Sequence, residues 1–235
     1  MKIASWNANM AFRRKKRYLL EYNPDILLIQ ECEYPEHSGT WDEFDDWEWV
    51  GDNKNKGIGI FRQNGYTVER IPEEVPAQYF LPVGIPEVPQ LTILNMWAMN
   101  NTEQHEKRYI GQLWTALQHY DFVDEKTVIA GDINWNVQWD ESPKYDLVGD
   151  YRDVIDTLDQ YGLRSVYHEQ SGDDYGDESK PTFFMRRKKG RPFHTDHMFL
   201  PSSFIDSVSE FDLGSYEDWS EHSDHMPLIA EFSVE

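Results

Sequence analysis

Polar side chains stand at the ends of five apolar segments of this 235-residue chain, at positions where buried strands are expected to end or begin. The residues concerned are Asn7, Glu31, Asp132 with Asn134, Asp196, and Asp224 with His225. A strand that is buried on both faces accommodates a carboxylate only where the group is paired, ligates a metal or opens onto a cleft. Carboxylates grouped with Asn and His suit phosphoryl chemistry that is assisted by a hard divalent cation.

Each of these signals also has an ordinary structural explanation. Gly131-Asp132 fits a turn after a strand, as such pairs usually do. Ser223-Asp224 fits a cap or a turn, and Glu31 fits a solvated strand end. The combination is more informative than its parts, because it places carboxylates, amides and an imidazole at strand ends that can converge on one cleft.

The elements that must position these residues predict an α/β protein. Strands are predicted at residues 2–9, 26–31, 58–62, 66–71, 91–98, 127–130 and 226–234, and helices at 13–22, 103–120 and 150–161. Residues 182–187 and 195–200 predict a hairpin, and the proline-rich residues 72–89 predict an irregular surface excursion. We find neither a repeat nor a flexible linker and expect a single domain over residues 1–235.

The chain is strongly acidic, but its positive residues are concentrated. The net charge is −21 and the isoelectric point is near 4.6, which argues against loose binding of nucleic acid over the whole surface. Two clusters of five basic residues each, at 13–17 and 186–191, hold ten of the 22 basic residues. Either both clusters are solvated surfaces of their elements, or they mark a binding surface for an anion.

The sequence shows no feature of a membrane protein or of a secreted protein. It has no run of about 18 apolar residues, and residues 1–7 lack the basic and apolar regions of a signal peptide. The single cysteine, Cys32, excludes an intramolecular disulfide and gives no indication of a disulfide-linked partner. We therefore expect a cytoplasmic protein without a membrane partner.

Seven short motifs, in order along the chain, resemble the endonuclease/exonuclease/phosphatase superfamily, which includes exonuclease III, the abasic-site endonucleases and deoxyribonuclease I. They are 5–9 (SWNAN), 24–31 (PDILLIQE), 57–60 (GIGI), 131–134 (GDIN), 182–184 (TFF), 196–199 (DHMF) and 223–227 (SDHMP). The resemblance implies a four-layer α/β/β/α sandwich like that of deoxyribonuclease I. In this fold two facing mixed β-sheets have helices outside and a catalytic cleft at one edge.

The resemblance also implies a metal site and a substrate-side group. On the metal side, Glu31 corresponds to the main ligand of Mg²⁺ or Mn²⁺, with Asn7 beside it and Asp224 as a second carboxylate. Oxygen donors of this kind are the usual ligands of hard divalent cations.

On the substrate side, Asp132 corresponds to the residue that orients and deprotonates the attacking water, and Asn134 to a donor to the scissile phosphate. His225 corresponds to the imidazole that supports the negative charge developing on the phosphate. Asp196 corresponds to the carboxylate that holds this ring and keeps it protonated. Physical reasoning agrees, because a carboxylate beside a His raises its pKa and a carboxylate near water can accept its proton.

One position departs from the family pattern. Many members have a His or Tyr in the middle strand that contacts the scissile phosphate, and here Trp97 falls at that position. Asn100 follows, which matches an Asn of the abasic-site endonuclease branch. An indole N–H can donate one hydrogen bond but cannot titrate. Either the phosphate contact is altered or the rate is lowered, and we expect Trp97→Tyr to keep or raise the activity.

The sequence is also compatible with a zinc site. Residues 194–197 and 222–225 both have the pattern His-x-Asp-His, and two His with two Asp can bind zinc. Adjacent residues of a strand point to opposite faces, so only part of each segment can reach one ion. We therefore favour Mg²⁺ or Mn²⁺.

The two basic clusters flank the motifs that are expected to line the cleft. Arg13, Arg186 and Arg187, together with Trp97 and Asn100, are the residues that we expect to bind substrate. Aromatic side chains lie among the basic ones, which favours a polyanion whose bases stack. We expect a metal-dependent nuclease with DNA as the substrate rather than RNA. The alternatives are a phosphoesterase for a small or lipid-linked phosphate, as in inositol phosphatases and sphingomyelinases, and a non-catalytic binding module on the same fold.

Overall fold

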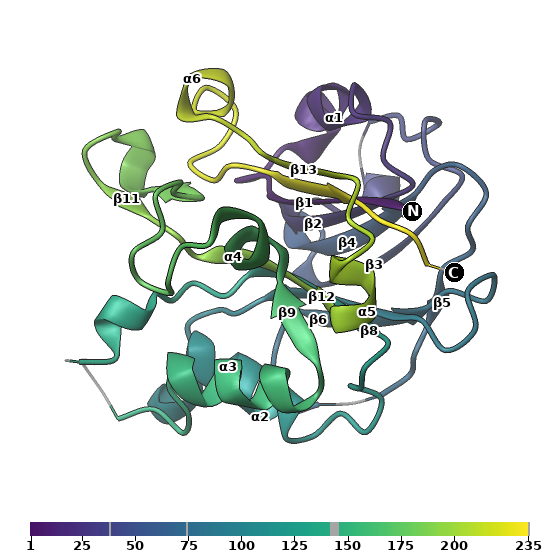
Figure 1. Cartoon of the computed structure of the whole chain (residues 1–235). Coiled ribbons are helices and arrows are strands. Elements are labelled where there is room, and N and C mark those ends of the chain that lie inside the picture. Colours follow the sequence, from purple (N-terminus) through teal and green to yellow (C-terminus); the bar gives the residue numbers. More distant parts are fainter. Residues whose placement is uncertain (38, 74, 142–145, 235) are drawn as a thin grey trace.

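Two six-stranded sheets lie face to face, and helices cover the outer side of each (Figure 1). Helix α1 (Phe12–Leu20) lies outside the first sheet, and α2 (Ile110–Leu117) and α3 (Tyr151–Gln160) lie outside the second. This computed structural model describes residues 1–37, 39–73, 75–141 and 146–234. The order of the layers confirms the predicted four-layer α/β/β/α sandwich. The single domain over residues 1–235 stays a prediction.

The first sheet contains strands from both ends of the chain. Its order is β13 (Glu210–Leu213), β14 (Leu228–Glu231), β1 (Lys2–Asn7), β2 (Ile26–Cys32), β4 (Lys56–Arg62) and β3 (Asp46–Asn53). β1 and β2 run parallel, and the other neighbours run antiparallel. The sheet is therefore mixed, as predicted.

The second sheet is mixed in the same way. Its order is β5 (Glu69–Arg70), β6 (Phe80–Gly84), β7 (Thr92–Trp97), β8 (Thr127–Asp132), β12 (Asp196–Pro201) and β9 (Leu163–Ser165), and only β7 and β8 are parallel. β10 (Phe183–Phe184) and β11 (Pro192–Phe193) form a separate hairpin. The short helices are α4 (Val166–Ser171), α5 (Ser202–Ile205) and α6 (Tyr216–Trp219), and the 3₁₀ turns are η1 (Pro35–His37), η2 (His105–Lys107), η3 (Val137–Trp139) and η4 (Met185–Arg187).

Alternation along the central strands builds the core. In β2, Leu28 packs between the two sheets, whereas Leu27 and Ile29 pack on the side of α1. Because successive side chains of a strand point to opposite faces, a strand covered on both sides must be apolar throughout. This explains why residues 26–29 form an uninterrupted apolar run.

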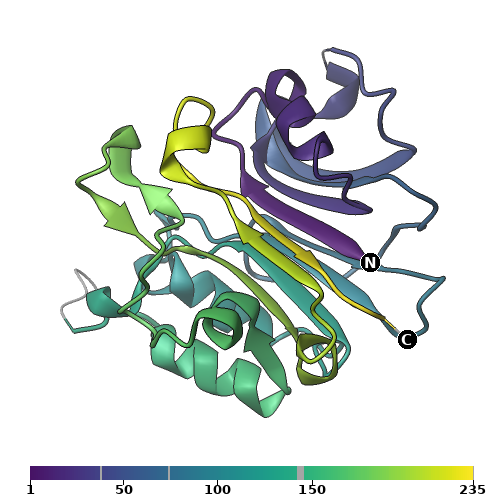
Figure 2. The same ribbon diagram turned by 45° about the horizontal axis from the view of Figure 1, so that its top comes forward.

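The polar strand ends meet at one edge of the sandwich. The edge lies beside the β10–β11 hairpin and α6, opposite the edge that carries both chain termini (Figure 2). β1, β7 and β8 all end there, and β12, which is antiparallel to β8, begins there. The fold therefore places the candidate residues of both sheets together.

Several local predictions are wrong. The helix predicted over residues 103–120 is only α2, because Tyr109 has a φ of +50° and separates it from the single turn η2. Residues 72–89 include the strand β6, which contains Pro82. The carbonyl oxygen of Pro82 lies on the side of the two-residue strand β5, so the N–H that a proline lacks would also lie on that side. The predicted hairpin partners belong to different sheets, since β10 pairs with β11 while β12 pairs with β8 and β9.

No helix among the described residues is long and apolar enough to cross a membrane. Cys32 is a fully buried free thiol, and burial raises its pKa. The cytoplasmic location stays a prediction.

Candidate active site

Three buried side chains, Asp132, Asp196 and His225, form a group whose ligand atoms all lie within 4.8 Å of one another. The Nδ1 atom of His225 lies 3.0 Å and 2.9 Å from the two carboxylate oxygens of Asp196. Its Nε2 atom lies 3.8 Å from Oδ2 of Asp132. The imidazole therefore stands between two carboxylates at the edge where the two sheets meet.

Strand pairing brings these residues together. Asp196 of β12 pairs directly with Asp132 of β8. His225 comes from the segment before β14 in the other sheet and forms an antiparallel bridge with Phe183, whose ring stacks on the imidazole at 4.5 Å between centroids. The indole of Trp6 in β1 donates a hydrogen bond to the carbonyl oxygen of His225 at 2.9 Å. The site thus depends on the packing of both sheets.

A close backbone approach beside this group requires glycine at position 131. Gly131 has a φ of +143°, and a Cβ atom there would lie 1.9 Å from the carbonyl oxygen of Met96. β8 continues through Asp132, so the Gly-Asp pair is part of the strand and not a turn after it. The glycine lets the parallel neighbour β7 pass close to the catalytic edge.

Burial and mutual charge set the protonation of the group. For His225, burial lowers the pKa, but the charges of Asp196 and Asp132 more than offset this effect and raise the pKa to about 10. Burial raises the pKa of Asp132 to about 7, and the charge of His225 acts in the opposite direction. With a raised pKa the imidazole is charged at neutral pH, and the group can transfer a proton and stabilise negative charge. Its three ligand atoms also lie close enough together to hold a metal ion.

Two asparagines hold the carboxylate of Asp132. Asn7 donates from Nδ2 to Oδ2 at 2.9 Å, and the backbone N–H of Asn134 donates to Oδ1 at 2.8 Å. Asn134 has a φ of +50°, a left-handed conformation that Asn tolerates better than most residues. The amide oxygen of Asn7 accepts from the backbone N–H of Asn9 at 3.0 Å. Asn7 therefore presents its nitrogen, and not its oxygen, to the carboxylates.

Glu31 stands beside this group at a bulge in β2. The pairing of β2 with β4 shifts between Gln30 and Cys32, and Glu31 has a φ of +53°. A residue other than glycine in this conformation is strained by about 1–3 kcal/mol, and such strain is typical of functional sites. Oε1 of Glu31 lies 3.5 Å from Nδ2 of Asn7, and Oε2 lies 3.1 Å from Nζ of Lys56. The side chain of Glu31 is 19% exposed.

Asp224 lies at the outer side of the same region. Its Oδ1 atom accepts a short hydrogen bond from Nδ2 of Asn9. Lys15 donates from Nζ to the carbonyl oxygen of Asn9 at 3.2 Å. Burial lowers the pKa of Lys15 to about 8, and the carboxylates of Asp224 and Glu31 act against this shift. Asn9 belongs to the first motif, but its type alone did not indicate that it would hold Asp224.

Trp97 ends β7 directly opposite Asp132. Its side chain is almost fully buried, and its Nε1 atom has no hydrogen-bond partner among the described residues. Nζ of Lys56 lies 4.5 Å from the centre of the indole, and the ring of Tyr79 lies 5.0 Å away. Asn100 is exposed, three residues further along the chain. The structure therefore shows an indole that supports a lysine, which the sequence did not predict.

Each His-x-Asp-His segment contributes one residue to the group around Asp132, whereas His197 and His222 lie elsewhere. Of their members, Asp196 and His225 come together. His197 points to the other side of β12, where its Nε2 atom lies 3.0 Å from the hydroxyl of Tyr151. His222 stacks on a tyrosine of α1. This arrangement argues against the zinc centre that the repeated pattern left open.

Members of both basic clusters lie near His222, which follows α6, and α6 lies between α1 and the β10–β11 hairpin (Figure 1). His222 stacks on Tyr18 at 3.9 Å between centroids, and Arg187 donates to the carbonyl oxygen of His222 at 3.4 Å. Burial lowers the pKa of His222, and the charges of Lys15, Arg17 and Arg187 add to this effect. Residues about 170 positions apart in the chain thus form one positive surface beside the catalytic edge.

Members of the clusters differ in their surroundings. Arg13 forms an ion pair with Glu33 at 2.6 Å, and Lys16 is buried against Glu43. Arg186 is exposed in the turn of the hairpin. Arg13 and Lys16 therefore fasten α1 to the segment between β2 and β3, whereas Arg186 is exposed to solvent.

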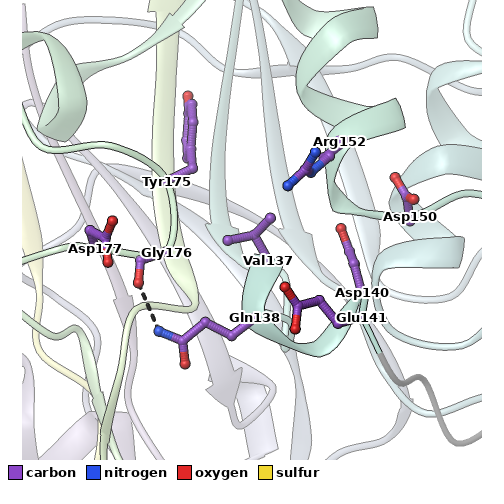
Figure 3. Close-up of a pocket in the computed structure, with 9 residues that line it drawn as sticks. All are labelled: Val137, Gln138, Asp140, Glu141, Asp150, Arg152, Tyr175, Gly176 and Asp177. Atoms are coloured by element: carbon purple, nitrogen blue, oxygen red, sulfur yellow. Dashed lines mark hydrogen bonds between the residues drawn. The ribbon is translucent and has the colours of Figure 1, made fainter.

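A separate pocket of about 550 Å³ lies near η3 and α3 (Figure 3). It is lined by Val137, Gln138, Asp140, Glu141, Asp150, Arg152, Tyr175, Gly176 and Asp177. Four carboxylates and one arginine face it, so its lining repels an anionic substrate. It contains no member of the catalytic group, and the strand edge remains the candidate active site.

Comparison with known proteins finds matches among solved structures alone. No protein-family model matches the sequence, and no curated protein matches it. A 3'-5' exonuclease from Neisseria meningitidis matches with a TM-score of 0.70 and 17% identity over 99% of this chain and 100% of its own. An AP endonuclease from Archaeoglobus fulgidus matches with a TM-score of 0.70 and 18% identity over 99% of both chains. The catalytic domain of Xenopus laevis APE2 matches with a TM-score of 0.67 and 14% identity over 99% of this chain and 91% of its own.

The chain therefore has the fold of the endonuclease/exonuclease/phosphatase superfamily. This confirms, at the level of the fold, the resemblance that the seven motifs indicate.

Proposed function

We propose that this protein is a metal-dependent phosphodiester hydrolase, a nuclease that acts on DNA in preference to RNA with Mg²⁺ or Mn²⁺. The observation that carries the proposal is the buried group of Asp132, His225 and Asp196. Hydrolysis of a phosphodiester needs a base for the attacking water and positive charge for the phosphate. Asp132 and His225 supply these two elements side by side.

Asp132 acts as the base that orients and deprotonates the attacking water. Its pKa of about 7 places it where a general base is most effective near neutral pH. Asn7 holds one carboxylate oxygen and the backbone of Asn134 holds the other. The direction of the carboxylate is therefore fixed before substrate arrives.

The charged ring of His225 contacts the phosphate and offsets the negative charge that develops on it. Nδ1 of His225 donates to Asp196, which keeps the proton on the ring and leaves the N–H at Nε2 for a phosphate oxygen. The side chain of Asn134 donates a further hydrogen bond to the scissile phosphate. Both donors act where the charge grows during the reaction.

Glu31 and Asp224 are the carboxylates that we assign to the metal. Glu31 lies near the amide of Asn7, and Asp224 accepts from Asn9. Their carboxylate oxygens are hard donors of the type that Mg²⁺ and Mn²⁺ prefer. A bound cation would supply Lewis-acid polarisation of the phosphate. Asn7 offers its oxygen to a cation only if its amide turns over, and otherwise it holds Asp132.

The concentrated positive surface around His222 supports a nucleic-acid substrate. The chain as a whole carries a charge of −21 and repels polyanions elsewhere, so binding is confined to the catalytic edge. DNA is favoured over RNA because the Neisseria 3' phosphatase NExo was solved with a product DNA hairpin and the Archaeoglobus protein is an AP endonuclease.

The salt dependence of cleavage tests this surface. A variant with Arg186, Arg187, Lys188 and Lys189 changed to Ser should lose about 2–4 from the slope of log kcat/KM against log salt concentration. Lys126→Ser is the control, because Lys126 lies at the opposite end of β8, and it should leave the slope unchanged. An equal slope in the fourfold variant and the wild type would remove the substrate surface from the proposal.

Cleavage of a substrate panel tests the function itself. The panel contains abasic duplex DNA, plain duplex DNA, single-stranded DNA, single-stranded RNA and a small phosphodiester, each with and without Mg²⁺. We expect Mg²⁺-dependent cleavage of DNA that Asp132→Asn abolishes. Turnover of the small ester alone would favour a phosphoesterase, and no turnover with metal bound would favour a binding module.

A further inference from the structure

Lys56 places a positive charge beside Glu31 and Trp97 that the proposed mechanism does not use. It is the first residue of β4, and its Nζ atom lies 3.1 Å from Oε2 of Glu31 and 4.5 Å from the centre of the Trp97 indole. We infer that Lys56 binds the substrate phosphate on the metal side of the cleft, with Trp97 as its platform. This inference rests on the proposed nuclease function.

The indole of Trp97 fixes where the ammonium lies. The ring is almost fully buried and packs against Tyr79 at 5.0 Å between centroids. Its Nε1 atom is buried and has no partner among the described residues, so the indole N–H is not available to substrate. The ring face attracts the cation that lies over it. Trp97 therefore acts on substrate through Lys56.

The β3–β4 hairpin holds Lys56 over the indole of Trp97 in the second sheet. Asn53 pairs with Lys56 where the hairpin turns, and the preceding Asp52 accepts a hydrogen bond from the hydroxyl of Tyr79 at 2.7 Å. Tyr79 leads into β6 of the second sheet, and its carbonyl oxygen accepts from the backbone N–H of Trp97 at 3.0 Å. The hairpin of the first sheet is thus tied to the strand that carries the indole.

The charge on Glu31 explains why Lys56 is free to bind a phosphate during the reaction. A carboxylate that ligates a divalent cation has less negative charge to offer to an ammonium. Lys56 is 35% exposed and needs another anion in that state, which the substrate phosphate supplies. A lysine suits this role because its flexible stem can stay on the indole while Nζ moves to the phosphate.

Lys56→Met tests the inference against the matched control Lys54→Met. Lys54 belongs to the same hairpin, and its Nζ atom lies 5.9 Å from the centre of the Tyr34 ring, whereas Glu31 forms its ion pair with Lys56. At saturating Mg²⁺ we expect Lys56→Met to lower kcat/KM for DNA about 100-fold, and Lys54→Met to change it less than about threefold. Lys56→Arg keeps the charge over the indole and should retain more activity than Lys56→Met.

Two binding measurements separate a phosphate contact from a merely structural role. In calorimetric titration without substrate, Lys56→Met should bind Mn²⁺ at least as tightly as the wild type, because the ammonium no longer competes for Glu31. With Ca²⁺ in place of Mg²⁺, the variant should bind a fluorescein-labelled DNA oligonucleotide about tenfold more weakly. Wild-type kcat/KM in Lys56→Met, or a loss of Mn²⁺ binding in parallel with activity, would overturn the inference.

The same binding assay distinguishes a failure of the inference from a failure of the proposed function. A wild-type protein that cleaves no nucleic acid but binds DNA in a manner sensitive to Lys56→Met would refute the nuclease and support the contact. Equal DNA binding by wild type and Lys56→Met would refute the contact, whether or not the wild type cleaves.

Discussion

His225 and His197 are both buried beside β12, but they lie on opposite sides of it and differ in charge. His225 faces the cleft between Asp196 and Asp132, which raise its pKa to about 10 although burial acts in the opposite direction. His197 faces the outer side, where its neighbour is the hydroxyl of Tyr151 and burial lowers its pKa well below the usual value. Burial is common to both rings, so the partner decides the charge.

The outer side of β12 is a packed histidine cluster, formed by His168, His194 and His197. Their ring centroids lie 4.9 to 6.0 Å apart. Nε2 of His194 and Nδ1 of His197 have no hydrogen-bond partner among the described residues, and burial lowers the pKa of both. Adjacent residues of one strand thus serve two regions, because Asp196 points to His225 and His197 points to the histidine cluster, where the carboxylate of Glu178 lies 3.4 Å from His168.

Asp132→Asn should give the largest effect. We expect activity to fall about 10³–10⁴-fold because the base is lost. The folded pKa of Asp132 is raised from 3.8 to about 7, so ionising the buried carboxylate costs stability as the pH rises through this interval. The variant should therefore be more stable near pH 8 by at least about 1 kcal/mol, as measured by urea unfolding. A variant that is inactive and also less stable would show that Asp132 holds the fold together.

Asp196→Asn should change the charge of His225. Without its main carboxylate partner, His225 has a lower pKa, and we expect kcat to fall about 100-fold near pH 8 and much less near pH 6. The alkaline limb of the pH–rate profile should move toward neutral pH. The stability that this pairing contributes is present below about pH 6.5 and is lost as the pH rises through about 10. A profile parallel to that of the wild type would contradict the assigned role of Asp196.

His197→Phe should change the histidine cluster on the outer side of β12 and leave kcat/KM within about threefold of the wild type. Because the folded pKa of His197 is lowered, the unfolded chain takes up a proton first as the pH falls below about 6.5. Stability is then lost toward acid by up to about 1.4 kcal/mol per pH unit. The variant should show a shallower loss in urea unfolding between pH 7 and pH 5. An unchanged slope, or a changed pH–rate profile, would break the separation of the two regions.

Tyr151→Phe should give the smallest effect on activity and a loss of stability of about 1–2 kcal/mol, because His197 loses its hydrogen-bond partner. Combining it with His197→Phe removes both partners and should recover most of that loss. Thermal unfolding of the two single variants and the double variant provides the comparison. Additive losses would show that the two side chains act independently.

The sequence predicted the fold well where a pattern is local and poorly where it depends on a neighbour. The apolar runs at 26–29 and 127–130 indicated strands buried on both faces, and both are central strands. A helix was predicted over residues 103–120, but the left-handed backbone at Tyr109 separates residues 103–108 from α2. β6 was missed because Pro82 is tolerated only where a short strand lies beside it.

The sequence predicted which residues form the candidate site, but it did not predict all the contacts that their side chains make there. The motifs indicated Asp132, Asp196 and His225, which the structure brings together. Lys56 was not singled out, because nothing in its local sequence indicates that it lies over Trp97, 41 positions away.

The sequence by itself determined which strands are buried and which polar residues stand at their ends, because side-chain alternation and residue type are local properties. Only the tertiary structure decided which of these residues meet and which are charged. His225 and His197 are both histidines beside apolar strands, and one is protonated because two sheets bring Asp196 and Asp132 to it. Charge in a buried site depends on neighbours and on exclusion of water, and both arise when the sheets pack.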